Sequence, residues 1–442
     1  MHNPKLIRIT TVPLSLNVLL KGQLKYMKAH FDVLAVAAGP QEELDAVGSR
    51  EGVPTRWVEM TRAITPLQDL KAVWQLYKIF KKEKPLIVHT HTPKAGIVGM
   101  LAAKLAGVPH RLHTVAGLPL LEATGTKRKL LDFVEKLTYR CATKVYPNSK
   151  GLYDIIIKQG YIQKNVIASK AKLIANGSSN GIDTIHFSPE QVSPAQKEQL
   201  RQELGISPQD FVFIFIGRLV GDKGINELVA AFASHCERNS TESHSEPQQS
   251  WGEGVSSGRH SERSEGASSG RHSERSEGAS SGTPKLVLVG PLEPHLDPLT
   301  PETISTIDQN PNIITTGFQN DVRPFLAISD ALVFPSYREG FPNVVMQAGA
   351  MGLPAIVTNI NGCNEIIIES KNGTIIPAKS GTSPSKPLQQ ALETAMHRFM
   401  EDKAWYNQLQ QNARPMICDR YEQKVVWEAL LEEYEGLISG GR

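Results

Sequence analysis

Residues 217–224 (GRLVGDKG) combine two cations with glycines in a way that suits a phosphate-bearing ligand. They follow an apolar run at 211–217 that is typical of a buried strand, and they open a helix. Backbone N–H groups at a helix start attract anions, Arg218 can fork across phosphate oxygens, and Lys223 supplies a point charge. The segment therefore predicts a phosphate-binding loop; the alternative is an exposed loop with incidental charge.

A carboxylate lies at a second strand-to-helix corner further along the chain. Residues 331–334 form a short apolar run, and a helix is expected over residues 342–351, before Gly352. Glu339 then lies in the connecting loop, at the carboxyl edge of a parallel sheet, where open α/β sheets bind ligands. We therefore expect Glu339 to contact the ligand, with an exposed loop acid as the alternative.

Histidines mark the ends of two expected strands in the first half of the chain. His89 and His91 are two residues apart, so they point the same way from a strand, as two metal ligands would. His113 ends the following strand. No third ligand of a suitable type stands out, so we expect no metal here. For His113, a buried histidine satisfied by hydrogen bonds is the alternative to a functional role.

Strands and helices alternate in both halves of the chain, which predicts two doubly wound parallel-sheet domains in the α/β class. In the first half, we expect strands at 6–11, 31–38, 53–58, 86–89, 110–114, 144–147 and 172–175, and helices at 22–30, 66–82, 95–106, 129–142 and 151–159. The second half adds strands at 211–217, 286–290, 313–316, 331–334 and 355–358, with helices at 224–236, at 342–351 and from residue 388 onward. Residues 13–21 are expected to be a loop, and 176–183 (NGSSNGID) a hinge.

Two of the expected helices are amphipathic. The helix at 66–82 carries a stripe of the kind that faces a core, made of Leu67, Leu70, Val73, Trp74, Tyr77 and Phe80. The last helix, at 423–438, has a similar pattern.

Residues 238–283 interrupt the second half with a repeat of low complexity. The sequence SSGRHSERSEGA at 256–267 recurs unchanged at 268–279, and Trp251 and Val255 are its two large apolar side chains. Such a segment buries too little apolar surface to offset the entropy of ordering, so we expect a disordered surface insertion. Metal binding by its histidines is a minor alternative.

The composition and charge of the 442 residues place the chain among ordinary soluble proteins. Residues 1–181 contain 27 Lys and Arg against 12 Asp and Glu, although the whole chain carries only +3. This basic first half predicts an anionic partner, either lipid headgroups or a phosphate-bearing acceptor; lysines that merely solvate helix ends are the alternative. The four cysteines are scattered, and no apolar run reaches the length of a membrane span or a signal peptide, so we expect a cytoplasmic protein.

The segment from Ser336 to Glu369 resembles the donor-site motif of retaining, nucleotide-sugar-dependent glycosyltransferases of family 4, which have the GT-B fold. That family carries a Glu, seven residues and a second Glu, with Gly-Phe-Pro-Asn after the first; here Gln347 replaces the second acid. The segments HTHTPKAG, HTVAGLPL, PNSKG, GSSNGID and REGFPNVV are most similar to CapM-like capsular or exopolysaccharide enzymes. The resemblance implies an acceptor-side domain at 1–180, a donor domain at 181–419 and a last helix at about 420–438 that packs back on the first domain.

The resemblance also assigns roles to individual residues. It implies that Arg218 and Lys223 hold the donor diphosphate and stabilise its charge, while Glu339 binds hydroxyls of the donor sugar. Gln347 stands where the family binds the ribose diol, and His113 matches a histidine that faces the donor sugar across the cleft. The remaining implied contacts are Gly340, Phe341, Pro342 and Asn343 beside the sugar, Phe318 and Val322 at the nucleobase, and Gly22, His91 and Lys94 on the acceptor side.

Together these features predict a metal-independent enzyme that needs no cofactor and binds no nucleic acid. It would transfer a sugar from a nucleotide diphosphate, UDP in the first instance, to a hydroxyl of a lipid-linked saccharide in capsular polysaccharide, exopolysaccharide or lipopolysaccharide synthesis. The protein would be cytoplasmic, or peripheral on the inner face of the membrane. Two alternatives stay open: a non-catalytic GT-B subunit of a polysaccharide assembly complex, prompted by Gln347, and a GT-B sugar-nucleotide epimerase or hydrolase.

Overall fold

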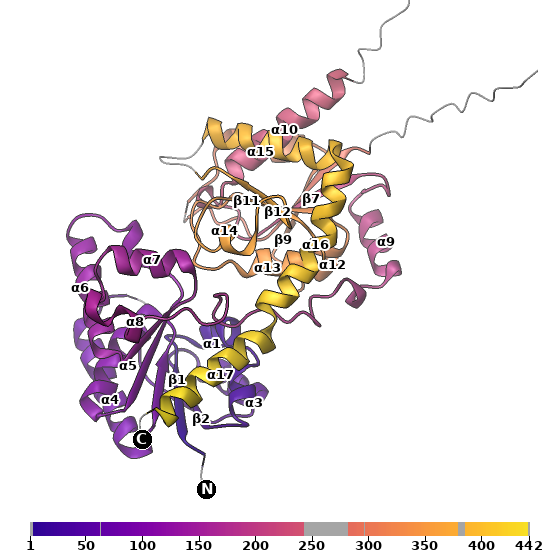
Figure 1. Cartoon of the computed structure of the whole chain (residues 1–442). Helices are drawn as coiled ribbons and strands as arrows, with labels where there is room; N and C mark the ends of the chain where they lie inside the picture. The colour runs from indigo at the N-terminus through magenta and orange to yellow at the C-terminus, as the bar shows by residue number, and fades with distance from the viewer. Residues whose placement is uncertain (1–2, 62, 243–281, 296, 379–384, 441–442) are drawn as a thin grey trace, which may run out of the picture.

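Two lobes, each built on one six-stranded sheet, make up the computed structural model, which describes residues 3–440 except 62, 243–281, 296 and 379–384 (Figure 1). The first sheet has the strand order β3-β2-β1-β4-β5-β6 and the second β9-β8-β7-β10-β11-β12, with every named pair parallel. In each sheet the order reverses beside the strand that comes first in the chain, β1 or β7. This arrangement confirms the predicted doubly wound α/β class, and the two reversals are the switch points at which such sheets bind ligands.

The first lobe comes from the first half of the chain. Its strands are β1 (Lys5–Ile9), β2 (Asp32–Ala37), β3 (Thr55–Trp57), β4 (Ile87–Thr90), β5 (His110–Val115) and β6 (Lys144–Pro147). Its helices are α1 (Pro13–Leu19), α2 (Gln23–Met27), α3 (Gln41–Glu51), α4 (Pro66–Glu83), α5 (Pro93–Ala106), α6 (Gly125–Cys141), α7 (Lys150–Lys158) and α8 (Ile167–Lys170), with 3-10 turns η1 (Pro119–Glu122) and η2 (Lys164–Val166).

The second lobe comes from the second half. Its strands are β7 (Phe211–Ile216), β8 (Pro284–Val289), β9 (Ile313–Gly317), β10 (Ala331–Phe334), β11 (Ala355–Thr358) and β12 (Gly373–Ile376). The 3-10 turns here are η3 (Pro189–Gln191) and η4 (Gly221–Lys223). The helices are α9 (Pro194–Glu203), α10 (Ile225–Glu242), α11 (Pro301–Gln309), α12 (Arg323–Ala327), α13 (Asn343–Ala350), α14 (Cys363–Ile366), α15 (Lys386–Glu401), α16 (Lys403–Tyr421) and α17 (Gln423–Ser439).

The central strands form because their side chains are apolar on both faces. In β7, four consecutive residues from Val212 to Phe215 are completely buried, and β10 is buried along its whole length. Side chains that alternate between the two faces of a strand then require helices on both faces of the sheet. The buried side chains on both faces of the second sheet belong to one continuous apolar core.

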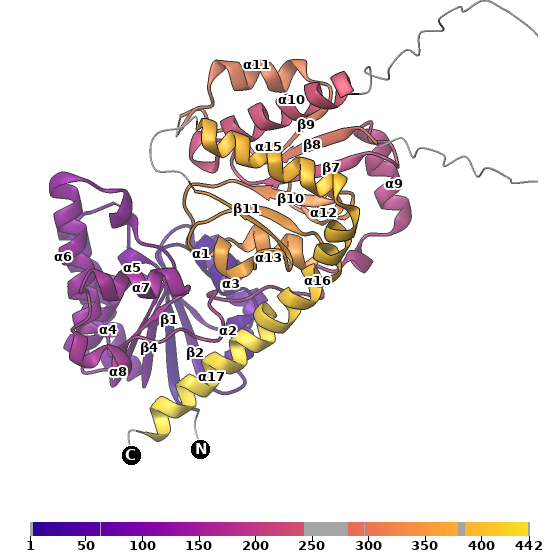
Figure 2. The same cartoon turned by 45° about the horizontal axis from the view of Figure 1, so that its top comes forward.

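The last helix, α17, belongs to the first lobe by its packing (Figures 1 and 2). Its Leu430, Leu431 and Tyr434 join the core on the face of the first sheet that α1, α2 and α3 also cover. The Tyr434 hydroxyl lies 2.5 Å from Nδ1 of the buried His89 on β4. The chain therefore crosses from the second lobe to the first along α16 and α17, and the last residues complete the first core.

Several expected elements differ from the structure. Residues 13–19, expected to be a loop, form α1, with Pro13 at its first turn, where a missing N–H costs nothing. Residues 172–175 form no strand, because only an isolated bridge joins the neighbouring Ala171 to Val145. The helix α3 and the edge strand β12 were not expected.

The apolar stripe expected on the helix at 66–82 is only partly buried. In α4 the buried residues are Ala72, Val73, Leu76 and Phe80. Leu67, Leu70 and Trp74 are 85%, 62% and 56% exposed, respectively. The helix therefore packs on a face rotated away from the predicted stripe, and it leaves large apolar side chains in solvent.

Other expectations concern the insertion, the cysteines and the membrane. Residues 238–242 of the expected disordered insertion at 238–283 instead continue α10, which ends at Glu242, so the insertion begins later than expected. Residues 243–281, with the repeat, lie outside the described residues, and their expected disorder stays a prediction. The cysteines Cys141, Cys236, Cys363 and Cys418 are all free thiols. Among the described residues, no helix has both the length and the apolar character that crossing a bilayer requires.

Candidate active site

The switch point of the second sheet brings together the two loops that the sequence analysis singled out. Strands β7 and β10 are direct neighbours, so the loops after them leave the same sheet edge side by side. Gly224 closes the first loop in a left-handed conformation (φ 73°), and a Cβ there would lie 2.3 Å from the Pro335 carbonyl oxygen. Only glycine allows this approach. Gly224 therefore allows the loop that carries Lys223 to pack directly against the loop that carries Glu339.

Lys223 and Glu339 form the central contact of this site. The Lys223 ammonium (Nζ) lies 2.5 Å from Oε1 of Glu339, and the two side chains are only 15% and 19% exposed. Ser336, completely buried, donates a hydrogen bond from Oγ to the same carboxylate oxygen at 3.1 Å. The carboxylate is therefore oriented by a neutral donor as well as a cation.

Arg218 lies on the same loop but turns toward a different partner. Its Nη1 is 3.4 Å from Oε2 of Glu293, and its side chain is 41% exposed. An ion pair joins this loop to the loop that carries Glu339, because Nη2 of Arg338 lies 2.9 Å from Oδ2 of Asp222. Arg218 is thus a loosely held cation on a fixed loop.

A cavity of about 220 Å³ lies between the two lobes, with Glu339 on its wall. The second lobe lines it with Glu339, Gly340, Phe341, Pro342 and Asn343, and the first lobe and the hinge with Val18, Leu19, Ala116, Asn148, Ser178, Ser179 and Asn180. All four residues predicted to lie beside the donor sugar thus share one cavity with Glu339. The polar residues at 178–180 were not among the predicted site residues, although the turn-forming sequence GSSN at 177–180 indicates an exposed loop with hydrogen-bonding side chains.

The Gly340 backbone touches the first lobe directly. A Cβ on Gly340 would lie 2.0 Å from the carbonyl oxygen of Ala116, the residue that follows β5. The side chain of Phe341 packs edge-on against Tyr421 of α16, with ring centroids 5.4 Å apart. The loop that carries Glu339 is therefore wedged between the first lobe and the crossing helix.

Glu365, whose role the sequence left open, fastens one lobe to the other. Its two carboxylate oxygens accept hydrogen bonds from the backbone N–H groups of Lys150 and Gly151, at 2.6 and 3.0 Å. These are the first residues of α7, so an acid of the second lobe satisfies the amides at a helix start of the first. Beside it, Asn361 accepts from Ser149 Oγ at 2.8 Å. This junction was invisible to the sequence because its partners are more than 200 residues apart.

Replacing Glu365 by glutamine should loosen the junction, because a neutral amide retains only one acceptor oxygen for two backbone donors. Hydrogen bonds to charged groups contribute roughly 1.5–3 kcal/mol each, so we expect a loss of stability of about 2 kcal/mol. A lower melting temperature and a larger radius of gyration in small-angle X-ray scattering would show it. The control is Glu401→Gln, an exposed acid at the end of α15. If both variants behave alike, Glu365 does not hold the lobes together.

His113 is buried in the first lobe in this structure. Its side chain is 2% exposed, beneath Gly96 of α5, where a Cβ would come within 2.5 Å of the imidazole ring. Nδ1 lies 2.8 Å from the Thr90 hydroxyl, and burial lowers the pKa of His113 to about 4. The ring is thus a neutral core group. Ala116, three residues further on, lines the cavity and His113 does not, so the role that the resemblance implies for His113 stays a prediction.

The predicted acceptor-side residues are also engaged in internal contacts. Gly22 has φ 80°, and a Cβ there would lie 2.7 Å from the ring of Trp427 on α17. In this structure the backbone of Gly22 therefore packs closely against α17. Lys94 pairs with both carboxylate oxygens of Asp69 at 2.6 Å. His91 is buried, and its Nε2 accepts a hydrogen bond from Nε of the fully buried Arg8 at 3.0 Å. These contacts give each residue a structural role in this conformation.

The residues predicted to bind the nucleotide lie at the same sheet edge as Glu339. Gln347 is half-buried on α13, and its side chain makes no hydrogen bond within the described part of the chain. Phe318 follows β9 and is 69% exposed, while Val322 packs on the second core. Among the described residues, no group of three or more His, Cys, Asp or Glu side chains is placed to hold a metal ion.

Comparisons with known proteins agree with this architecture. The sequence matches the model of a glycosyl transferase 4-like domain over residues 20–177 and that of glycosyl transferases group 1 over residues 276–398. It is 28% identical to the capsular polysaccharide biosynthesis glycosyltransferase CapM of Staphylococcus aureus, over 99% of this chain and 98% of the relative. It is 30% identical to an Escherichia coli UDP-Gal:alpha-D-GlcNAc-diphosphoundecaprenol alpha-1,3-galactosyltransferase, over 73% of this chain and 70% of the relative.

The same architecture recurs in a solved structure, that of Anabaena HepE in complex with UDP and glucose. It superposes with a TM-score of 0.69 at 18% identity, covering 98% of this chain and all of the other. At that identity the likeness concerns the fold alone. With the sequence matches, it confirms the predicted family: the chain is a glycosyltransferase that belongs to the group 1, family 4 enzymes and has the GT-B fold.

Proposed function

We propose that the protein transfers a sugar from a UDP-sugar to a hydroxyl of a lipid-linked saccharide in surface polysaccharide biosynthesis, with retention of anomeric configuration. The observation that carries the proposal is the contact between Lys223 and Glu339, because Glu339 also lines the cavity between the lobes. The names of the relatives support it, since one acts in capsular polysaccharide biosynthesis and another uses UDP-Gal and a diphosphoundecaprenol-linked sugar. The HepE structure contains UDP and glucose.

The proposed chemistry assigns opposite roles to the two members of the pair. Lys223, with Arg218, would stabilise the charge that grows on the diphosphate as the bond to the sugar breaks. Glu339 would accept hydrogen bonds from hydroxyls of the donor sugar. The acceptor hydroxyl would attack from the side of the leaving group, and its proton would pass to the departing diphosphate. The loosely held Arg218 would have to leave Glu293 to join the site.

We propose that Gln347 binds the ribose hydroxyls more weakly than the acid usual in the family. An amide oxygen accepts hydrogen bonds, but a bond to a charged acceptor is roughly twice as strong. The change Gln347→Glu should therefore tighten UDP binding by about tenfold, equivalent to ~1.4 kcal/mol. Calorimetric titration with UDP measures this. Gln390→Glu, the same change at an exposed site on α15, serves as the control; equal or weaker binding by Gln347→Glu would contradict the proposal.

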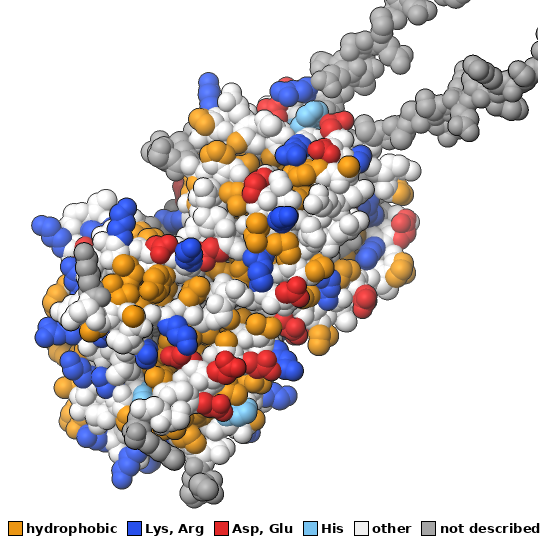
Figure 3. Space-filling model, in the orientation of Figure 1, with side chains coloured by type: hydrophobic (Ala, Val, Ile, Leu, Met, Phe, Trp, Pro, Cys, Tyr) orange, Lys and Arg blue, Asp and Glu red, His pale blue; other side chains and the backbone are white. Residues whose placement is uncertain are grey.

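The first lobe offers a surface for a peripheral position at the cytoplasmic face of a membrane. Besides Leu67, Leu70 and Trp74 of α4, it exposes Leu130 and Phe133 of α6, at 43% and 62%. Figure 3 shows hydrophobic side chains on this lobe, with Lys and Arg along its outer edge. Apolar side chains flanked by cations suit an anionic lipid surface, where a lipid-linked acceptor would reside.

Incubation with labelled UDP-sugars, with and without a lipid-linked saccharide and in the presence of EDTA, tests the proposed function. We expect the labelled sugar to appear on the lipid-linked acceptor, and EDTA to have no effect. Binding without turnover would instead indicate a non-catalytic subunit, and inversion at C2 an epimerase. Release of free labelled sugar at the same rate with and without the acceptor would indicate a hydrolase.

A further inference from the structure

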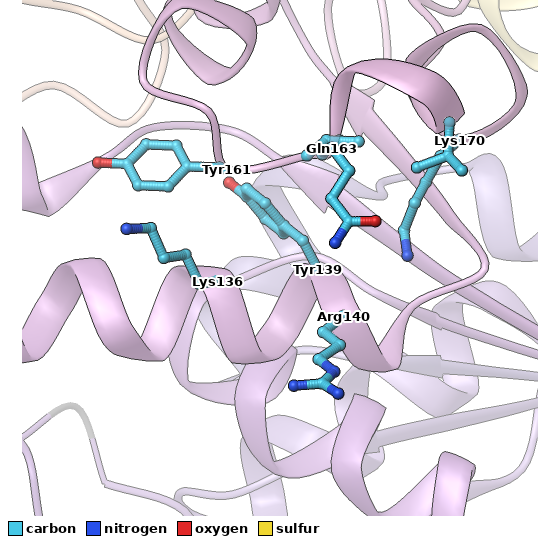
Figure 4. Close-up of a pocket in the computed structure, with 8 residues that line it drawn as sticks. Lys136, Tyr139, Arg140, Tyr161, Gln163 and Lys170 are labelled. Atoms are coloured by element: carbon cyan, nitrogen blue, oxygen red, sulfur yellow. The ribbon is translucent and has the colours of Figure 1, made fainter.

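A second cavity, of about 470 Å³, opens in the first lobe away from the loops that carry Lys223 and Glu339. It lies between the C-terminal half of α6 and the segment that leads from α7 into α8 (Figure 4). Its lining residues are Lys136, Tyr139, Arg140, Tyr161, Ile162, Gln163, Val166 and Lys170. None of them was singled out by the sequence or used by the proposed transfer reaction.

The charge of this cavity is strongly positive. Lys136, Arg140 and Lys170 line it, and none of the three forms an ion pair with a described residue. Burial, followed by the nearby charge of Arg111, lowers the pKa of Lys170. A lysine that is partly desolvated beside another cation gains most from a bound anion.

The acids next to the cavity do not balance these cations. Asp132 is already held by the Tyr161 hydroxyl at 2.5 Å and by Arg128 at 3.3 Å. Glu135 is 7% exposed, and burial raises its pKa to about 7, although the neighbouring Tyr139 hydroxyl opposes the rise. Glu135 therefore offsets the cations less than a carboxylate with an ordinary pKa would. The cavity keeps a net positive charge.

The walls of the cavity are rigid and aromatic. Tyr139 and Tyr161 are both buried, and their rings meet edge-on with centroids 6.2 Å apart. The Lys136 ammonium lies 5.9 Å from the centre of the Tyr161 ring. In Figure 4, Gln163 and Lys170 point from one wall toward α6, which carries Lys136 and Tyr139. The cavity thus takes its cations from two elements, Lys136 and Arg140 from α6 and Lys170 from α8.

An apolar surface continues from the cavity along α6. Phe133 precedes Lys136 by three residues and Arg140 by seven, so the three share one face of the helix. Phe133 is 62% exposed. A ligand with a charged head and an apolar portion would contact both parts of this face.

We propose that this cavity is a binding site for a phosphate or diphosphate group, separate from the donor site between the lobes. Two sources have this chemistry: the headgroup of an anionic lipid and a soluble phosphate compound. The inference does not depend on which sugar the enzyme transfers. It follows from three cations that line one cavity of the first lobe and form no ion pair with a described residue.

Inorganic pyrophosphate is the probe for the site, titrated calorimetrically into the full-length protein. The test variant is Lys136→Gln with Lys170→Gln, and the charge-matched control is Lys82→Gln with Lys158→Gln, two exposed lysines of the same lobe. Both are made in a Lys223→Met background, so that binding at the donor site is suppressed. We expect the test variant to bind pyrophosphate about tenfold more weakly than the control. Equal affinities would overturn the proposal.

Sedimentation with phosphatidylglycerol vesicles, compared with phosphatidylcholine vesicles, identifies the source. If the test variant loses both pyrophosphate and phosphatidylglycerol binding relative to the control, the site takes a lipid headgroup. If it loses pyrophosphate binding alone, the site takes a soluble phosphate compound; both results support the site. A failed transfer assay with intact pyrophosphate binding would reject the proposed function and leave this inference standing.

Discussion

Lys223→Met should reduce sugar transfer by about 100- to 1,000-fold in kcat, because loss of one preorganised donor to a developing charge costs roughly 3–4 kcal/mol. The substitution keeps the length of the side chain and removes its charge. It also leaves Glu339 without its cation in a site where that carboxylate is only 19% exposed. UDP binding should weaken as well, because Lys223 would hold the diphosphate in the ground state too. Initial rates with a labelled UDP-sugar, together with calorimetric titration of UDP, measure both effects.

Two companion variants separate charge from general damage. Lys223→Arg keeps the cation and should retain more activity than Lys223→Met, while Lys371→Met, at an exposed site of the same lobe, should be indistinguishable from the wild type. Arg218→Ala should also lose transfer if that arginine leaves Glu293 to reach the diphosphate. A kcat within about twofold of the wild type in Lys223→Met would remove the lysine from the reaction.

Glu339→Gln should separate turnover from nucleotide binding. It preserves the shape of the side chain but removes the charge that would hold the donor sugar, so we expect kcat/KM to fall by about 100-fold, or ~2.7 kcal/mol. UDP carries no sugar, and Lys223 would no longer be paired with a carboxylate at 2.5 Å. UDP should therefore bind as tightly as to the wild type, or more tightly.

Both substitutions are thus expected to reduce turnover, but only Lys223→Met should weaken UDP binding. Calorimetry with UDP and initial rates with the intact donor give both quantities for each variant. A Glu339→Gln variant that loses UDP binding in parallel with activity would mean that the carboxylate supports the nucleotide or the fold of its loop. The roles proposed for the two residues would then have to be exchanged or abandoned.

The parts of the fold that sequence pattern could predict are those that local chemistry determines. Strands such as β7 and β10 are continuous apolar runs, and glycines such as Gly224 and Gly352 mark corners that only a residue without Cβ can form. The adjacency of Lys223 and Glu339 followed, because two loops at one edge of a parallel sheet converge. At these positions the local preference of the residues agrees with the conformation that the whole fold needs.

What the sequence could not indicate are the positions for which a distant partner decides the outcome. The stripe on α4 is amphipathic by spacing, yet α5 covers a neighbouring face, and the helix alone cannot reveal that. His113 was placed by resemblance, but the small Gly96 of α5 makes room for its ring in the core. Glu365 meets α7 only after both lobes have formed. Each of these positions depends on contacts across many residues, which neither periodicity nor a motif contains.

The crossing of α17 onto the first lobe has a consequence for synthesis on the ribosome. The first sheet emerges early, but Leu430, Leu431 and Tyr434, which complete the cover of one of its faces, emerge only after the whole second lobe. At about 5–20 residues per second, the unsealed face must wait for some tens of seconds while the second lobe is translated. In that interval α1, α2 and α3 cover their part of this face, while the part that α17 covers stays exposed to solvent. We therefore expect a fragment ending before residue 423 to aggregate unless α17 is supplied as a separate peptide.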